Sequence, residues 1–389
     1  MKSVFFGILV LFISGLQLQA QNNYALPPYE FSGYVKDVQT VFVPEDMKEN
    51  WLSDNAIHNR LKFTYYPTSW LTLDIQARNR FIYGDFVKLF PDYTQYALNQ
   101  DYYADLDWVW FENESAVGIS EIDRLNAQFI KGKWELTLGR QRINWGMNLV
   151  WNPNDVFNTF SYFDFEYEER PGTDAARIKY YGSLTSSAEL VYQAGDSIEK
   201  MAMAGLYRFN KWGYDFQFLG GFMGNDYLAG FGYSGHIGGA AFRGEMTWFQ
   251  PRKSIADTTS IVVASLSSDY TFENNLYLHG GFLFNSNGKS GKAGGIGVFT
   301  TGELSPKTLS RGKVNLFGQI TYNITPLVKG GVSTIMNPQD LSAFVSPSID
   351  VSISDNFQLS GIGQLFFGQR DTEFGKIGQI GYLRFKYSF

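Results

Sequence analysis

Apolar and polar side chains alternate one by one along several stretches of the chain. Between Leu71 and Tyr83 the odd positions are mostly apolar, whereas the even positions from Thr72 to Arg80 are all polar. A period of two residues places the two kinds of side chain on opposite faces of a β-strand. Segments 57–65 and 383–389 repeat the pattern. One face of each predicted strand therefore contacts a dry medium and the other contacts water.

The same alternation extends over most of the chain and predicts eighteen strands. They cover residues 31–43, 56–66, 70–83, 121–131, 134–145, 173–183, 187–195, 200–209, 213–223, 226–236, 238–250, 259–272, 276–285, 313–324, 327–336, 340–353, 357–367 and 377–389. Short turns alternate with longer polar loops, and the longest loops are 84–120, 146–172 and 286–312. This layout is typical of an outer-membrane barrel. Sixteen strands are the alternative, because three segments separate their two faces poorly: 31–43, 200–209 and 327–336.

An outward apolar face requires a surrounding medium without water, which a lipid bilayer provides. In lipid every backbone polar group must be paired, so the sheet has to close on itself. Aromatic residues near the strand ends suit the girdles found at both membrane interfaces. They are Tyr65, Tyr66, Trp70, Trp134, Trp212, Tyr214 and Trp248. The expected fold is all-β: a single transmembrane antiparallel up-and-down β-barrel over residues 31–389, with space for a short helix in loop 84–120.

The first twenty residues resemble a secretory signal peptide. Lys2 gives a basic start, residues 4–13 are apolar, and residues 18–20 form a plausible cleavage site. No later stretch approaches the roughly 20 apolar residues of a membrane-spanning helix. Residues 21–30 would then be a short periplasmic segment, too short for the plug domain of a large transporter. We expect export to the outer membrane of a Gram-negative cell.

Composition narrows the function further. Aromatic residues make up 17% of the chain and charged residues only 18%, which is unusual for a soluble enzyme. The absence of cysteine excludes disulfides and thiolate metal sites. His58, His236 and His279 lack the spacing of metal ligands. We expect no cofactor, metal or enzymatic activity, although His279 is the one candidate for a hydrolase of the outer-membrane phospholipase type. The net charge of −6 argues against a nucleic-acid partner.

Strand parity assigns many basic side chains to the lumen. We refer to the following set as the basic wall: Arg60, Lys62, Arg78, Arg80, Arg124, Arg140, Arg142, Arg177, Lys179, Arg384 and Lys386. Inward acidic residues lie mostly on the opposite side, for example Asp215, Glu245 and Asp269. A channel wall of one charge sign raises the local concentration of counter-ions. The alternative is that these cations only pair with loop carboxylates and stiffen the barrel.

The third long loop, 146–172, supplies such carboxylates among many aromatic residues. They are Asp155, Asp164, Glu166, Glu168 and Glu169. In general diffusion porins the third external loop folds inward and narrows the pore. By analogy, we expect these residues to form a constriction opposite the basic wall. The alternative is an ordinary surface loop.

Two members of the basic wall break the alternation of their strand. Leu136 and Leu138 face lipid, and strict parity would place Arg140 and Arg142 there as well. An arginine facing lipid at mid-bilayer costs roughly 2–4 kcal/mol. We therefore expect a β-bulge at Gly139 that turns both arginines inward.

Two segments carry a family resemblance. Residues 139–146 read Gly-Arg-Gln-Arg-Ile-Asn-Trp-Gly, and residues 152–155 read Asn-Pro-Asn-Asp. They resemble porin-like outer-membrane barrels of largely unassigned function, and the Gly-Arg-Gln strand end is loosely similar to alginate-export-type barrels. The C-terminal Phe389, aligned with Tyr387 and Phe385, resembles the signal that the barrel-assembly machinery recognises.

These features together favour a passive channel for small hydrophilic solutes, with a preference for anionic ones. The alternative function is a substrate-specific barrel that binds or exports an acidic polysaccharide or another polymer. The expected partners are outer-membrane lipid, the assembly machinery and the solutes. The oligomeric state is left open by the sequence.

Overall fold

Long antiparallel strands make up most of the chain in a computed structural model, which describes residues 27–45, 51–90, 93–98, 102–163, 169–252, 259–294 and 304–389. The strands are β1 (Tyr29–Pro44), β2 (Leu52–Thr68), β3 (Leu71–Gly84), β4 (Asp107–Asn113), β5 (Ala116–Lys131), β6 (Trp134–Gln141), β7 (Thr173–Ser183), β8 (Ser186–Gln193), β9 (Ala202–Lys211), β10 (Tyr214–Met223), β11 (Asp226–Ile237), β12 (Ala240–Pro251), β13 (Ile261–Thr271), β14 (Leu276–Asn285), β15 (Val314–Thr325), β16 (Val328–Asn337), β17 (Ser342–Ser352), β18 (Phe357–Phe367) and β19 (Gly378–Ser388). The predicted signal peptide lies outside the described residues.

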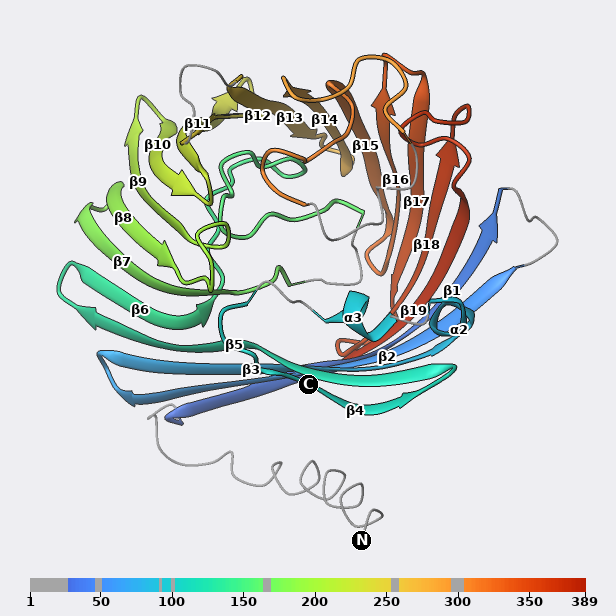
Figure 1. The fold of residues 1–389 in the computed structure, drawn as a ribbon, viewed down its shortest axis with the longest axis horizontal. Coiled ribbons are helices and arrows are strands. Elements are labelled where there is room, and N and C mark those ends of the chain that lie inside the picture. The colour runs from blue at the N-terminus through green and yellow to red at the C-terminus, as the bar shows by residue number, and fades with distance from the viewer. Residues whose placement is uncertain are drawn as a thin grey trace, which may run out of the picture.

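The strands close into a ring, which Figure 1 shows end-on. Strands that follow one another along the chain pair antiparallel, β3 also pairs directly with β5, and β1 pairs with β19 to complete the circuit. Apart from β4, eighteen strands form this ring. The predicted closed barrel is confirmed, and the alternative of sixteen strands is wrong. Even the three poorly patterned segments form regular strands: β1, β9 and β16.

Loop 84–120 contains more structure than the alternation predicted. It holds two short helices, α2 (Asp85–Leu89) and α3 (Tyr93–Ala97), and the extra strand β4. β4 pairs with the first residues of β5, which begins five residues earlier than expected, at Ala116. None of the described helices is long and apolar enough to cross a membrane.

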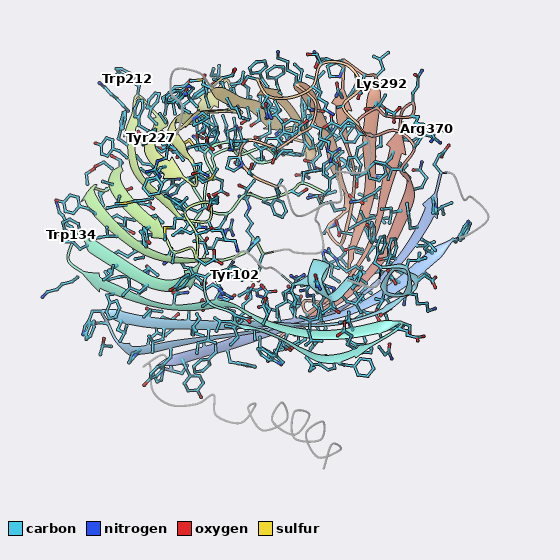
Figure 2. The ribbon with its side chains drawn as sticks, viewed as in Figure 1. Tyr102, Trp134, Trp212, Tyr227, Lys292 and Arg370 are labelled. Carbon is cyan, nitrogen blue, oxygen red and sulfur yellow. The ribbon has the colours of Figure 1, made fainter. Side chains whose placement is uncertain are left out.

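Apolar side chains cover the outer surface of the ring. Phe63, Leu125 and Leu138 are among the large exposed hydrophobic residues, whereas their chain neighbours such as Arg124 are buried. Trp134 and Trp212 lie outside the ring in Figure 2, and Tyr102 lies within it. The alternating pattern therefore separates a lipid-facing surface from the lumen.

A group of polar residues interrupts the apolar outer face of β1, β2, β3 and β5. Asn55 Nδ2 donates to Asp37 Oδ1 over 2.9 Å, and Asn79 Nδ2 donates to Asn59 Oδ1 over 3.1 Å. The Ser120 hydroxyl donates to Asn79 Oδ1 over 2.6 Å. These residues occupy the outward parity shared with exposed Ile57 and Ile75. Their mutual hydrogen bonds satisfy polar groups that lipid would leave unpaired.

Candidate functional site

The described residues of the loop between β6 and β7, 142–163 and 169–172, lie inside the ring, and we refer to this loop as the inner loop (Figure 1). Its Trp151 ring packs edge-on against Phe317 of β15, and Phe163 packs against Phe344 of β17. Gln364 Nε2 of β18 donates to the Phe163 carbonyl over 3.1 Å. The inner loop therefore starts at β6, crosses the lumen and contacts the far wall. Its residues 164–168 lie outside the described chain.

A buried carboxylate on β12 holds the inner loop. Glu245, only 2% exposed, accepts backbone N–H groups from Met147, from Asn148 (2.6 Å) and from Asn154 (3.1 Å). Three donors converge on one side chain, each from a backbone group that would otherwise be unpaired. Hydrogen bonds to a charged acceptor are among the stronger ones in proteins. Glu245 therefore fixes two separate turns of the inner loop to the barrel wall.

The Asn-Pro-Asn-Asp segment has a docking role in this contact. Asn154 Nδ2 donates to the Phe231 carbonyl of β11 over 3.0 Å, and the Thr247 hydroxyl donates to Asn154 Oδ1 over 2.7 Å. Asn148 adds a further anchor, because its side chain bonds Ser265 and Ser267 of β13, each over 2.6 Å. These contacts attach the inner loop to β11, β12 and β13.

Asp155, the last residue of that segment, closes the inner loop on itself. Its Oδ1 accepts the Trp145 N–H over 3.2 Å, and its Oδ2 pairs with Arg170 Nη1 over 2.8 Å. Burial raises the pKa of Asp155 to about 6, and the neighbouring Arg170 charge opposes this shift. The residue therefore acts as an internal brace and does not face an open pore.

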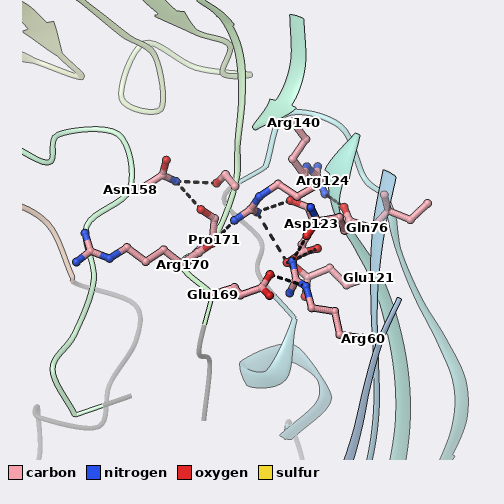
Figure 3. Close-up of polar contacts among 12 residues, drawn as sticks. Arg60, Gln76, Glu121, Asp123, Arg124, Arg140, Asn158, Glu169, Arg170 and Pro171 are labelled. Atoms are coloured by element: carbon pink, nitrogen blue, oxygen red, sulfur yellow. Dashed lines mark hydrogen bonds and ion pairs between the residues drawn. The ribbon is translucent and has the colours of Figure 1, made fainter. Parts of the chain in front are cut away.

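The basic wall is densest on β2, β3 and β5, where Figure 3 shows its contacts with the inner loop. The fully buried Arg60 contacts Asp123 (Nη2 to Oδ2, 2.7 Å) and Glu169 (Nε to Oε2, 2.6 Å). Lys62 pairs with the second oxygen of Glu169. Arg124 Nη1 donates to the Asp123 carbonyl over 2.6 Å. Glu169, at the end of the inner loop, thus joins this part of the wall.

Asp123 and Arg124 both point to this cluster because β5 contains a bulge. The register between β3 and β5 shifts between Gln76 and Ala77, which leaves Asp123 as the extra residue. A bulge lets two consecutive side chains reach the same face. The sequence-based assignment placed Arg124 inward but contained no signal for Asp123.

Arg140 does not face lipid. It is 1% exposed and its Nε lies 2.8 Å from Asp174 Oδ1, while its guanidinium stacks 3.6 Å from the centre of the Tyr102 ring. The expected bulge at Gly139 is wrong in form: the pairings of β5–β6 and β6–β7 run through Gly139 without a register shift. Instead, the positive φ of Gly139, 109°, redirects the chain.

Arg142 lies in the inner loop, one residue beyond β6, and its side chain is exposed. It forms no hydrogen bond or ion pair with any other residue that the structure describes. The charges that act on it include those of Arg170, Asp155 and Arg124. Arg142 is therefore a cation of the lumen whose donors are open to solutes.

The remaining members of the basic wall are mostly paired. Glu189 binds Arg177 over 2.9 Å and Lys179 over 3.3 Å. Arg384 donates to the Ser360 hydroxyl over 3.0 Å, and Lys386 lies 4.7 Å from the centre of the Tyr34 ring. Arg80 donates a hydrogen bond to the Ala97 carbonyl and forms an ion pair with Glu121. Arg78 lies opposite Arg60 in the register of β2 and β3.

The predicted acidic residues of the inner loop have different positions. Asp155 is buried, and Glu169 contacts the wall. Asp164, Glu166 and Glu168 lie outside the described residues. The structure therefore places two of the five candidates, and only one of them against the basic wall.

Strand parity missed several luminal cations, and three of them lie on β1, on β9 and in the inner loop. Lys36 of β1 is 1% exposed, Arg208 of β9 bonds Gln217 Oε1 over 3.1 Å, and Arg170 braces the inner loop. β1 and β9 belong to the poorly patterned segments, so their inward faces could not be assigned with the others. The position of Arg170 depends on the path of the loop, which strand parity does not address.

The arrangement places cations and a fixed loop on facing sides of one passage. Around Arg60 the structure describes a mixed group of charges. The cations are Arg60, Lys62, Arg78, Arg80, Arg124, Arg142 and Arg170, and the carboxylates are Asp74, Asp107, Glu121, Asp123, Asp155 and Glu169. Charges held in a partly dry passage act strongly on passing ions. No group of three or more potential metal ligands occurs in the described part of the chain.

Comparison with known proteins connects this geometry to solved barrels. Acinetobacter baumannii OccAB2 superposes with a TM-score of 0.62 at 8% identity, covering 95% of this chain and 99% of that one. A. baumannii OccAB3 gives 0.58 at 11% identity (93% and 99% covered), and Pseudomonas aeruginosa OccK11 (OpdR) gives 0.58 at 9% identity (93% and 96% covered). These identities show a shared fold only. No family model and no curated protein matches the sequence, so the likeness to alginate-export-type barrels stays a prediction.

Proposed function

We propose that this protein is an outer-membrane channel through which small hydrophilic solutes diffuse passively, with a preference for anions. The eighteen-stranded barrel is the first support, because a barrel of this size can enclose an aqueous channel. Its structural neighbours, the Occ and Opd proteins, are outer-membrane porins.

The observation that carries the proposal is the inner loop fixed across the lumen opposite the basic wall. Glu245 and Asn148 attach the loop on one side, and Glu169 meets Arg60 and Lys62 on the other. In the proposed channel, a loop anchored on both sides of the lumen narrows the passage and holds its charged side chains at fixed positions.

Arg142 supports the anion preference. Most other cations of the wall are neutralised by carboxylates, whereas the Arg142 side chain is exposed and has no ion-pair partner among the described residues. Arg170 and Arg124 add positive charge near Arg142, and Asp155 and Glu169 add negative charge. In the proposed channel, an anion passing the loop therefore meets an exposed guanidinium that forms no ion pair with the described residues.

The test is the conductance of the purified barrel in a planar bilayer with a salt gradient. We expect stable single channels and a reversal potential of the sign for anion selectivity. Arg142→Gln should lower the selectivity, and Arg252→Gln is the matched control, because Arg252 stacks on Phe222 and Tyr227 at the rim. A barrel without conductance would overturn the channel, and a cation-selective one would overturn the anion preference.

A further inference from the structure

The lumen contains a second polar region, at the short-turn end of β13 to β16. A cavity of about 440 Å³ opens there. Its lining consists of Thr271, Asn275, Tyr277, Gln319, Thr321, Asn323 and Lys329. The turns β13–β14 and β15–β16 are short, so this is the periplasmic end of the barrel. The cavity lies on the wall that carries Phe317, on which the inner loop rests through Trp151.

The lining side chains form one continuous patch. The register pairs Thr271 with Tyr277 and Tyr277 with Thr321, while Asn323 is opposite Lys329. All have the parity of buried Phe317, so they face the lumen. Four neighbouring strands thus present hydroxyl, phenol, amide and ammonium groups near the same end of the barrel.

These groups have unused hydrogen-bonding capacity. Within the described residues, the side chains of Thr271, Tyr277, Thr321, Asn323 and Lys329 form no hydrogen bond or ion pair. Gln319 is the exception, since its side chain contacts His279. This differs from the basic wall, where arginines and carboxylates satisfy one another. A ligand in the cavity would meet donors and acceptors that are already oriented and need not break a partner.

We propose that this cavity is a binding subsite for saccharides. Neutral amide and hydroxyl groups match the many hydroxyls of a sugar, and the Tyr277 ring offers an apolar surface to its C–H face. The volume lies in the range of small-molecule sites. Lys329 is the one charged group in the lining and donates hydrogen bonds to ring or hydroxyl oxygens. The inference rests on the proposed channel only in that a solute would reach the subsite through the lumen.

Binding can be tested without conductance. Purified full-length barrel in detergent is titrated with maltose, lactose, glucose and glucuronate by isothermal calorimetry. We expect saturable binding of at least one of these saccharides. The double variant Gln319→Ala and Asn323→Ala should weaken it by about tenfold or more, as expected when two hydrogen bonds are lost. Gln128→Ala is the matched control, because this amide faces the lumen at the same end of the opposite wall, next to Thr72.

The outcomes separate the two proposals. Saturable binding that is lost in the double variant and kept in Gln128→Ala supports the subsite, whether or not the barrel conducts. No saturable heat with any of the four saccharides, or equal binding by all variants, overturns it. Unchanged heat-modifiable migration on electrophoresis shows that each variant is folded. Loss of conductance would overturn the channel and leave the binding result interpretable.

Discussion

Glu169 in the inner loop and Arg60 on β2 form an ion pair with 2.6 Å between Oε2 and Nε. The Arg60 side chain is fully buried, whereas that of Glu169 is 23% exposed and also meets Lys62. One carboxylate thus contacts two cations. Asp123 contributes a second negative charge to Arg60, but Lys62 has no other ion-pair partner in the described chain. Glu169 therefore sets how much positive charge this part of the lumen presents.

Replacing that carboxylate should make the channel more anion-selective. Glu169→Gln keeps the size of the side chain and removes one negative charge. At a distance of about 10 Å in water, one unit charge changes the energy of a monovalent ion by about 0.4 kcal/mol. This energy corresponds to roughly a twofold change in the local concentration of the ion. We expect the anion-to-cation permeability ratio to rise by about this factor in reversal-potential measurements. Glu135→Gln, which removes a luminal carboxylate that bonds Tyr181, serves as the control. A fall in the ratio would contradict the assignment.

Loosening the inner loop at its anchor should change current noise more than selectivity. In Glu245→Gln one oxygen becomes an NH₂ group, which cannot accept the backbone N–H groups that Glu245 now binds. Each hydrogen bond to a charged group contributes about 1.5–3 kcal/mol. We expect larger open-channel fluctuations and a higher mean conductance in single-channel recordings. Asp215→Asn is the control, because among the described residues the Asp215 side chain bonds only the exposed side chain of Asn210. Quiet currents like those of the parent would show that other contacts suffice to hold the loop.

Asp155 should make stability depend on pH. Burial raises the pKa of Asp155 from an ordinary value near 4 to about 6. Between about pH 4 and pH 6 the folded state therefore binds more protons than the unfolded state. The contribution of this group to stability is therefore complete below about pH 4 and is lost as the pH rises to about 6. The loss amounts to about 3 kcal/mol.

Comparison with Asp155→Asn isolates this effect. The unfolding temperature of the parent should fall relative to that of the variant as the pH rises from 4 to 6.5. At higher pH the difference between the two should stay constant. Heat-modifiable migration or circular dichroism in detergent would measure it. Asp196→Asn, at an exposed position, should show no such trend. A difference that is independent of pH would refute the buried, protonated state.

Strand parity predicted the ring and most of the luminal cations because both depend on short-range pattern. A period of two fixes which residues share a face, so the alternation alone was enough to assign Arg60, Arg80 and Arg177 to the lumen. Lys36 was missed because Asp37 and Gln39 place polar groups on the outward side of β1 and blur the contrast.

Contacts between distant residues could not be predicted in this way. Glu245 binds Asn148 across 97 positions of sequence, and Gln364 binds Phe163 across 201. Nothing in the local pattern specifies where a loop of this length attaches. Likewise, strand parity did not predict β4. The register of β4 against β5 shifts between Val109 and Phe111, so its apolar and polar side chains do not alternate regularly.

Gly139 should tolerate no side chain. Its φ of 109° is disfavoured for any other residue, and an added Cβ would lie 2.2 Å from the Leu125 carbonyl oxygen. Gly139→Ala should therefore displace β6 from β5. The variant should destabilise the barrel by about 1–3 kcal/mol, which is the usual cost of a strained backbone site. The folded fraction on semi-native electrophoresis measures this. Gly280→Ala is the control, since its Cβ would meet nothing within 4 Å. Normal folding of Gly139→Ala would mean that the turn at this position relaxes readily.

The outward polar group offers a test of hydrogen bonding in lipid. Asn79 links Asn59 and Ser120, so Asn79→Ala leaves a carbonyl oxygen and a hydroxyl without their partner. Each unsatisfied group costs about 1–3 kcal/mol, and lipid offers no replacement for it. The triple variant Asn59→Ala, Asn79→Ala and Ser120→Ala removes all three polar groups and should recover much of this loss, because replacing every partner leaves none unpaired. We therefore expect unfolding in lipid vesicles to require less denaturant for the single variant than for the triple variant. If the triple variant unfolds at the lower denaturant concentration, the expectation is wrong. The three side chains then stabilise the barrel through their hydrogen bonds as a set. An unpaired polar group would then cost less at this membrane-facing position than we expect.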